Sequence, residues 1–549
     1  MNTSLFQVNL SGILKILSDS LYSQKEVFLR ELLQNAIDAI QARKYLNAAF
    51  EPKIRVDFFD TDTGKALVIN DNGVGLTKSE VEEFLSKVGA SSKSKEALED
   101  IRAEFIGQFG IGLLSCFMVS DEIVVHSRSA KADYTVRWVG NIDGTYQTSV
   151  VEGEEAEQEI GTRVVLKLRS DIQLDRQKLL ELLDLYGAYL DVPVEVEANG
   201  RFVKTLQTQF PWENTRFSDS ALQLGRKLFR ENFSSYIPLT DRSNQTKGIA
   251  YILPRPTQYQ AAAQNRVYIK RMFITEEESN ILPEWAFFVK AIINSDNLAP
   301  TASRESLYKN DTLQTVREDL GHCIKDYLKQ LSIDSPETLE QIIKVHGYAL
   351  KSLCLKDADF LGFIADWFTF PTTMGELTLA QIKERTDSVF YVPDIDEFRQ
   401  IIPVARANNQ LVINAGYVYD ADLLHAIGDL DAARLYQRID TEYFGNFLND
   451  ISIENHDLFR NRLDRLQIHL NAFKCELDIK QFAPENIPAI FYMSEKKLIE
   501  RDVTKIKEES NDLWAGISNM VFQSVGGFQS KLYLNFNNPI VRKLLHADS

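Results

Sequence analysis

Apolar positions along the first part of the chain change their spacing several times, and each change predicts a different element. From Leu10 to Ala42 they recur at the spacing of a helix. Five short runs rich in β-branched and aromatic residues follow, at 54–59, 66–70, 122–127, 134–140 and 162–168. Residues 77–105 are instead polar, charged and rich in Ser and Lys. The pattern predicts a helix packed on a sheet within roughly the first 200 residues, with one polar segment inside it.

The rest of the chain alternates between helical and strand-like stretches. Strand signals stop near 205–215 and return, among helical segments, at 266–274, 389–392 and 410–416. A helical seam after Ile453 consists of Phe459, Leu463, Leu466, Leu470 and Phe473. We interpret this seam as a core-facing helix, and a self-association seam is the alternative. These shifts predict an α+β multidomain protein, divided into 1–210, 211–445 and 446–549.

Net charge and cysteine content narrow the function classes. The 549 residues contain 61 Lys+Arg and 78 Asp+Glu, a formal net charge of −17, which disfavours general attraction to a nucleic-acid backbone. The four cysteines lie far apart without metal-ligand spacing, so a reducing compartment is the simplest interpretation. The first residues lack the features of a secretion signal, and the longest apolar stretch, 111–119, is about half of a membrane span. We therefore expect a cytoplasmic protein without membrane or nucleic-acid partners.

Three polar residues share one stripe of the first helix. Glu31, Asn35 and Asp38 are separated by four and three residues, beside apolar positions that face a core. A carboxylate, an amide and a second carboxylate in this arrangement suit a general base for water, a metal-coordinating oxygen and a polar group that tunes them. For this helix taken alone, a solvated stripe is the alternative interpretation.

Two glycine-containing segments follow this helix. Asp71 ends a strand-like run, and Gly73 and Gly75 then bring bare backbone close to whatever lies beyond the strand. A buried carboxylate there accepts a hydrogen bond from an exocyclic amino group such as that of adenine. The second segment, which leads into an apolar helix and favours phosphate oxygens, contains Gly107, Gly110 and Gly112. Each segment alone is weak evidence for nucleotide binding. The first is more often a turn. The second matches neither the dinucleotide fingerprint nor a Walker A loop.

Together the three elements are far more specific, because they occur in one order. The segments FLRELLQNAIDAI, DNGVGLT and IGQFGIGLLS resemble the gyrase, heat-shock, histidine-kinase and MutL (GHKL) ATPase superfamily, and specifically the ninety-kilodalton heat-shock chaperones of the bacterial high-temperature protein G type. Further matches occur in YIKRMFI, LPEWAFFVKAIINSDNLAPTASRESL and LYLNFNNPIVRKLL. The resemblance implies an ATP-dependent chaperone of the stress response. Its expected parts are a GHKL-type α/β sandwich that binds ATP (1–210), an α/β middle domain (211–445) and a short α/β C-terminal domain (446–549) that ends before the family's dimer-clamping helices.

The resemblance also implies roles for individual residues. Glu31 is the base that polarises the attacking water, Asn35 holds Mg²⁺ against the phosphates, and Asp71 binds adenine together with Gly75 and Thr162. Arg304 reaches the γ-phosphate from the middle domain, where a guanidinium stabilises transferring phosphoryl charge; a surface ion pair with Glu305 or a neighbour is the alternative. The other implied nucleotide-binding residues are Asp38, Leu76, Lys93, Gly107, Gln108, Phe109, Gly110, Ile111, Gly112 and Leu113.

The sequence departs from the family at several of these positions. Leu76 stands in place of Met, Leu113 in place of Phe, and Tyr308 in place of Gln, while residues 90–93 (ASSK) are closer to MutL-like members. The resemblance implies client polypeptides as partners, and it leaves open whether the protein forms a homodimer. Two alternatives remain: a MutL- or gyrase-like ATPase acting on DNA, and a nucleotide-binding scaffold that does not hydrolyse ATP.

Overall fold

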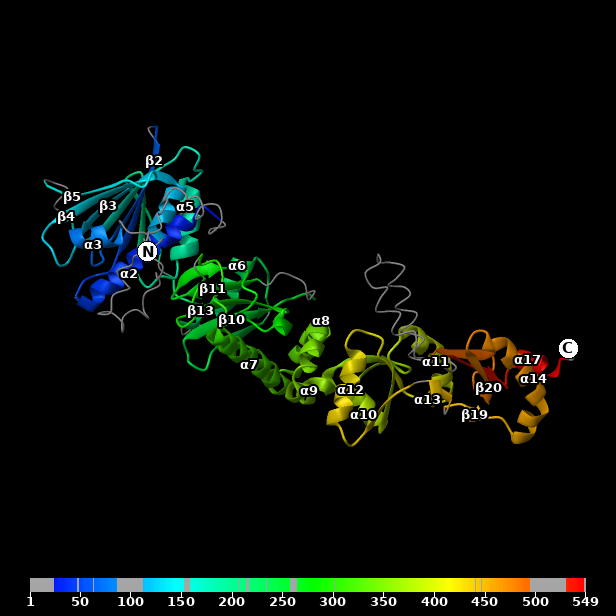
Figure 1. Ribbon diagram of the computed structural model, residues 1–549. Helices are drawn as coiled ribbons and strands as arrows, with labels where there is room; N and C mark the ends of the chain where they lie inside the picture. The colour runs from blue at the N-terminus through cyan, green and yellow to red at the C-terminus, as the bar shows by residue number, and fades with distance from the viewer. Residues whose placement is uncertain are drawn as a thin grey trace, which may run out of the picture. The chain divides into compact units, whose positions relative to one another are not determined.

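The protein is an α+β chain with several mixed sheets, as expected from its sequence (Figure 1). The computed structural model describes residues 24–46, 49–62, 64–85, 112–152, 158–206, 208–213, 217–233, 235–256, 264–301, 303–439, 441–445, 447–493 and 530–547. The chain forms two compact units, Met1–Tyr327 and Leu328–Ser549. The finer division into three domains stays a prediction.

An eight-stranded sheet dominates the first 206 residues, with the strand order β5-β4-β3-β6-β2-β1-β7-β8. Its strands are β1 (Ile54–Thr61), β2 (Gly64–Asp71), β3 (Ser120–Arg128), β4 (Thr135–Asn141), β5 (Tyr146–Val150), β6 (Gly161–Leu168), β7 (Val194–Ala198) and β8 (Arg201–Leu206). All neighbours are antiparallel except β1 and β7. The five runs predicted from the sequence are β1, β2, β3, β4 and β6, so the expected helix-plus-sheet arrangement is confirmed.

Helices pack their apolar side chains against this sheet. Its helical elements are α2 (Val27–Leu46), α3 (Lys78–Phe84), the 3₁₀ helix η4 (Gly112–Met118) and α5 (Arg176–Gly187). Phe28 and Leu32 of α2 share one buried core with Ile69 of β2 and Ile123 of β3. Thr77 begins α3 with a capping box that includes Glu80. The predicted helix over 10–42 corresponds to α2 from Val27, and its first part lies outside the described residues.

A five-stranded sheet, β12-β11-β13-β10-β9, completes the first unit. Its strands are β9 (Tyr236–Thr240), β10 (Thr246–Ile252), β11 (Asn265–Ile269), β12 (Met272–Thr275) and β13 (Val289–Ser295). The surrounding helices are η6 (Pro211–Glu213), α6 (Phe217–Phe229), η7 (Glu284–Ala286) and α7 (Asp311–Asp334), of which α7 runs on into the second unit. The strand-like run 266–274 divides into a hairpin, because Lys270 and Arg271 both have left-handed backbone (φ 47° and 68°).

The second unit contains a five-stranded sheet, β15-β14-β17-β16-β18, and a four-stranded sheet, β19-β20-β22-β21. The strands are β14 (Thr369–Thr372), β15 (Gly375–Thr378), β16 (Ser388–Val392), β17 (Val412–Asn414), β18 (Leu435–Arg438), β19 (Asn449–Asp450), β20 (Cys475–Gln481), β21 (Ala489–Met493) and β22 (Ser530–Asn535). The helices are α8 (Pro336–Cys354), α9 (Ala358–Ile364), η8 (Ala365–Trp367), α10 (Leu379–Arg385), α11 (Ile395–Ala407), α12 (Asp420–Leu430), α13 (Thr441–Gly445), α14 (Ile453–Asn471) and α17 (Pro539–His546).

The helical seam predicted after Ile453 corresponds to α14. Phe459 is buried in a small core, and Leu463 and Leu466 pack against that core, so the core-facing interpretation is confirmed for these residues. It is wrong for Phe473, which lies beyond the end of α14 and is 71% exposed. Within the described part of the chain, no helix has both the length and the apolar character needed to span a bilayer.

Candidate active site

Glu31 lies in the buried first half of α2 and is only 2% exposed. The first residue of η4, Gly112, packs directly on its carboxylate: a Cβ atom at Gly112 would lie 2.6 Å from Oε2 of Glu31. Glycine at this position therefore lets the end of the glycine-containing segment approach the carboxylate. Asp38, two turns further along α2, is 3% exposed. The solvated-stripe interpretation is wrong for both carboxylates.

Arg304 comes from the segment between β13 and α7 and places its guanidinium on Glu31. Its Nη1 donates to Oε2 of Glu31 and to Oε1 of Gln34, and the side chain is 6% exposed. Arg304 has left-handed backbone with φ 56°. The guanidinium of Arg30 supports this turn by donating to the carbonyl oxygens of Arg304 at 2.8 Å and Ser303 at 2.9 Å. Since Arg304 is buried and paired with Glu31, the interpretation as a surface ion pair is wrong.

Asp71 ends β2 directly opposite Thr162 of β6. Its Oδ1 accepts a hydrogen bond from the backbone N–H of Gly73 at 2.8 Å. Burial raises the pKa of Asp71 to about 7, while the backbone hydrogen bonds from Gly73 and Thr162 and the charge of Arg43 act in the opposite direction. A partly buried carboxylate at a strand end is a strong acceptor for a ligand N–H group.

The loop after Asp71 is docked on the end of β3. Gly75 has φ +64°, and a Cβ atom there would lie 2.0 Å from the carbonyl oxygen of Arg128, so only glycine fits. The backbone N–H of Leu76 donates to Oγ of Ser127 at 2.8 Å. The same Oγ lies 2.9 Å from Oγ1 of Thr162. Asp71, Gly75, Leu76 and Thr162 therefore gather at one end of strands β2, β3 and β6.

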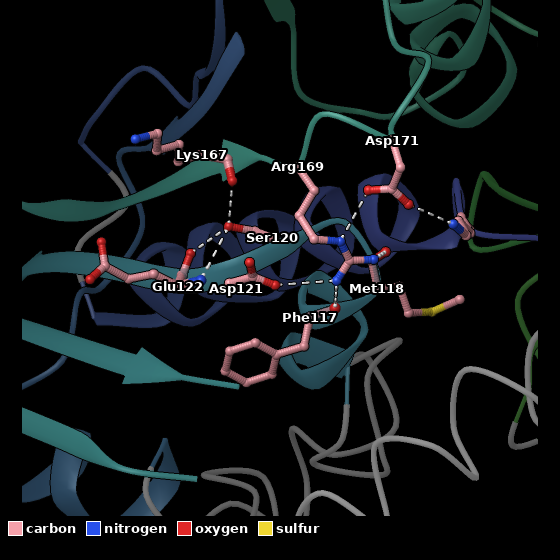
Figure 2. Close-up of polar contacts among 9 residues, drawn as sticks. Phe117, Met118, Ser120, Asp121, Glu122, Lys167, Arg169 and Asp171 are labelled. Atoms are coloured by element: carbon pink, nitrogen blue, oxygen red, sulfur yellow. Dashed lines mark hydrogen bonds and ion pairs between the residues drawn. The ribbon is translucent and has the colours of Figure 1, made fainter. Parts of the chain in front are cut away.

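Arg169 fixes the end of η4 (Figure 2). Its Nη1 donates to the carbonyl oxygen of Phe117 at 3.0 Å, and its Nη2 donates to that of Met118 at 2.6 Å. These carbonyls belong to the last turn of η4, where carbonyl oxygens have no N–H donor within the helix. Asp171 accepts from Nε of Arg169 at 3.3 Å and from Nζ of Lys25, just before α2, at 3.4 Å. Arg169 thus holds the end of the segment that follows the glycines, and Asp171 links it to Lys25, two residues before α2.

The structure places seven of the predicted residues in two groups: Glu31, Gly112 and Arg304 around α2, and Asp71, Gly75, Leu76 and Thr162 at the strand ends. Asn35 is exposed, one turn beyond Glu31, and Leu113 packs against the core at the start of η4. Six predicted residues lie outside the described residues: Lys93, Gly107, Gln108, Phe109, Gly110 and Ile111.

Sequence reasoning missed four residues that contact the site: Arg30, Gln34, Ser127 and Arg169. Gln34 was detectable, because it follows Glu31 by three residues and so lies on the same helical face. The other three make contacts that no local spacing reveals, since their partners lie 51 to 274 residues away.

Comparison with known proteins gives matches over both parts of this site. Residues 22–164 match the family model described as histidine kinase-, DNA gyrase B- and HSP90-like ATPase, and residues 254–398 match the model for Hsp90 protein. The chaperone protein HtpG of Alkalilimnicola ehrlichii is 29% identical, over 70% of this chain and 67% of the relative. HtpG of Buchnera aphidicola is 24% identical, over 99% of this chain and 92% of the relative. HtpG of Borreliella afzelii is likewise 24% identical, over 99% and 92%.

The chain is therefore similar to Hsp90 proteins in two regions. These matches support an HtpG-like Hsp90 protein with a GHKL-type ATPase domain, as the resemblance implied. The ATPase model covers Glu31, Asp71 and Thr162, and the Hsp90 model covers Arg304. The ion pair between Glu31 and Arg304 therefore joins the two regions that the family models recognise.

Nucleotide binding to this protein should weaken on acidification through pH 7. A carboxylate that accepts a hydrogen bond from adenine must be ionised, so protonation of Asp71, whose pKa burial raises to about 7, competes with binding. Affinity is full above pH 8 and falls by about tenfold between pH 7.5 and pH 6. Calorimetric titration with adenosine measures this directly, because adenosine has no phosphate that titrates in the same range. A flat profile would show that Asp71 does not receive the base.

Proposed function

We propose that this protein is an ATP-dependent molecular chaperone, in which ATP binding and hydrolysis drive lid and domain closure on client proteins. The observation that carries the proposal is the buried contact between Arg304 and Glu31. One residue belongs to the ATPase region and the other to the Hsp90 region, so a nucleotide that separates them changes the packing of both. Such a contact suits an ATPase that converts hydrolysis into movement.

Glu31 is proposed as the general base. Its carboxylate is buried, lies against Gly112 and accepts from Arg304, which keeps it in one position. When a triphosphate draws Arg304 away, Glu31 is left to accept a proton from the attacking water. The guanidinium, transferred to the γ-phosphate, then stabilises the negative charge of the transferring phosphoryl group.

The base of the nucleotide is proposed to bind at Asp71, Gly75, Leu76 and Thr162. Asp71 accepts from the exocyclic amino group, and Gly75 lets the loop that follows Asp71 pack against the carbonyl oxygen of Arg128. The phosphates would follow the segment from Gly107 to Gly112, with Gln108, Phe109, Gly110, Ile111 and Leu113 beside them and Lys93 from the polar segment as a further contact. Asp38, which is buried on α2, is the last of the proposed nucleotide-binding residues.

Mg²⁺ is proposed to accompany the triphosphate at Asn35. The exposed amide oxygen of Asn35, one turn from Glu31, fits an ion that takes few protein ligands and completes its shell with phosphates and waters. In the described parts of the chain, no cluster of three or more His, Cys, Asp or Glu could hold a metal by itself. When bound, the ion neutralises phosphate charge.

Client polypeptides are the partners that chaperone relatives imply. The net charge of −17 argues against the alternative of a DNA-acting ATPase, and we propose that nucleic acid is not a partner. We propose a homodimer on the ground of the family resemblance alone. We propose a cytoplasmic location because the four cysteines are free thiols, three of them buried.

Replacing Asp71 by asparagine tests the proposed function. The amide presents N–H to the amino group of adenine, so ADP affinity should fall by about a hundredfold or more. Calorimetric titration with ADP gives the affinity, and recovery of a heat-denatured reporter enzyme with and without ATP gives the chaperone activity. Both the ADP heat and the ATP-dependent part of the recovery should disappear.

Asp57→Asn is the matched control for this experiment. Asp57 is a half-buried carboxylate on the neighbouring strand β1, hydrogen-bonded to Asn70, and does not face α2. It should retain both ADP binding and ATP-dependent recovery. Unchanged ADP affinity in Asp71→Asn would mean that this segment is only a turn. Normal nucleotide binding without any ATP-dependent recovery in the parent protein would instead favour the non-hydrolysing scaffold.

A further inference from the structure

Ser127 joins the loop of Leu76 to Thr162 by a short chain of hydrogen bonds. It lies on β3, opposite Thr162 of β6, which in turn lies opposite Asp71 of β2. Residues directly opposite one another in a sheet point to the same face, so the three side chains form one row across three strands. Ser127 is fully buried at the inner end of the row.

The direction of each hydrogen bond follows from counting protons. A hydroxyl has one proton to donate and two lone pairs to accept with. The backbone N–H of Leu76 can only donate, so Oγ of Ser127 accepts from it at 2.8 Å. The serine proton has two acceptors within reach, Oγ1 of Thr162 at 2.9 Å and the carbonyl oxygen of Gly161 at 3.4 Å. The shorter contact places it on Thr162.

Thr162 is then an acceptor towards Ser127 and keeps its own proton for a partner on the other side. Its hydroxyl makes no other hydrogen bond within the described residues, and Thr162 is partly exposed next to Asp71. The carboxylate of Asp71, which accepts, and the hydroxyl of Thr162, which donates, therefore stand side by side. A ligand edge that matches them presents a donor beside an acceptor.

We propose that Ser127 is a specificity-determining residue that orients the hydroxyl of Thr162 to read the N1 atom of adenine. Adenine carries its exocyclic amino donor next to the N1 acceptor, which matches this order. Guanine and hypoxanthine carry an oxygen acceptor next to an N1–H donor. An acceptor would then face the Asp71 carboxylate and a donor would face the Thr162 hydroxyl. Ser127 itself does not touch the base, so it is a positioning residue. The inference rests on the proposed nucleotide-binding function and names the base that the site selects.

The test compares ADP with 1-deaza-ADP, in which a C–H group replaces N1, by calorimetric titration at pH 8, where Asp71 is ionised. The parent protein should bind ADP about tenfold more tightly than 1-deaza-ADP, the effect of one well-oriented hydrogen bond. Ser127→Ala should bind ADP about tenfold more weakly than the parent and no longer distinguish the two ligands. Thr162→Val removes the hydroxyl that would donate, so it should give the same result. This variant replaces Ser127→Ala in the test if Ser127→Ala does not fold.

Ser120→Ala is the matched control. Ser120 lies on the same strand β3, is equally buried, and donates to the carbonyl oxygens of Glu122 and Lys167 instead of the site (Figure 2). Its loss should lower the melting temperature but leave the preference for ADP unchanged. A parent protein that binds ADP without preferring it over 1-deaza-ADP overturns the inference alone, as does an unchanged preference in Ser127→Ala. A parent protein that binds neither ligand overturns the proposed nucleotide site itself.

Discussion

Glu31→Gln should lower steady-state ATP turnover by at least about a hundredfold while leaving ADP affinity within about threefold of the parent. The amide keeps the shape of the side chain and an acceptor for Arg304, but it has no basic oxygen to take the proton of the attacking water. Loss of a positioned general base typically costs two to four orders of magnitude in rate. Phosphate release gives the turnover, and calorimetric titration gives the affinity.

Glutamine is the more informative replacement than alanine at this position. Glu31→Ala should show the same loss of turnover, but it also leaves the buried guanidinium of Arg304 without its carboxylate, which destabilises a protein by about 3 to 5 kcal/mol. Glu397→Gln is the matched control, because Glu397 is also a buried glutamate (4% exposed) on a helix, α11 of the second unit. It should hydrolyse ATP at the parent rate. The same rate in Glu31→Gln would remove Glu31 from the chemistry.

Local patterns along the chain were enough to predict the scaffold of the ATPase region. Alternating and β-branched runs predicted the strands β1, β2, β3, β4 and β6, because each has one face buried in the core that α2 and α5 share. The spacing of Glu31 and Asp38 was equally local, since one helix carries both. What spacing could not show is burial: the same stripe on a free helix would face water, and the packing of Gly112 and Arg304 on Glu31 helps to remove it from solvent.

The contacts that complete the site join residues far apart in sequence. The pairing of Arg304 with Glu31 spans 273 positions, and its geometry depends on a left-handed backbone at an arginine, which residue preferences disfavour. The hairpin at Lys270 and Arg271 was hidden for the same reason, because neither residue is a glycine. Family resemblance, and not periodicity, singled out Arg304. Its role at the γ-phosphate stays a prediction.

Arg304→Ala should lower ATP turnover by about a thousandfold with little change in ADP affinity. The expected size follows from other phosphate-directed arginines, whose loss costs three to five orders of magnitude. It is smaller if domain closure, and not chemistry, limits the parent rate, so single-turnover and steady-state rates should both be measured. Because ADP lacks the γ-phosphate, its affinity reports only that the base and the first two phosphates still bind.

Arg271→Ala is the matched control for Arg304→Ala. Arg271 is also an arginine with left-handed backbone in the first unit, and it is also ion-paired, with Asp191 and Glu213. Its replacement removes the same side chain from the same kind of backbone, away from Glu31. Parent turnover in Arg271→Ala together with a loss in Arg304→Ala would separate the role at the nucleotide from a general effect on the fold. Equal turnover in both variants would show that the pair with Glu31 is structural only.

Combining the two replacements tests whether Arg304 and Glu31 act as one unit. In the structure each holds the other. In the proposed mechanism both leave this pairing together, Arg304 for the phosphate and Glu31 for the water. The double variant Glu31→Gln/Arg304→Ala should therefore be no slower than the slower single variant, since residues that act in one step show non-additive losses. Losses that multiply instead would mean that Arg304 lowers the barrier independently of Glu31. The guanidinium would then act on the phosphate without controlling the base.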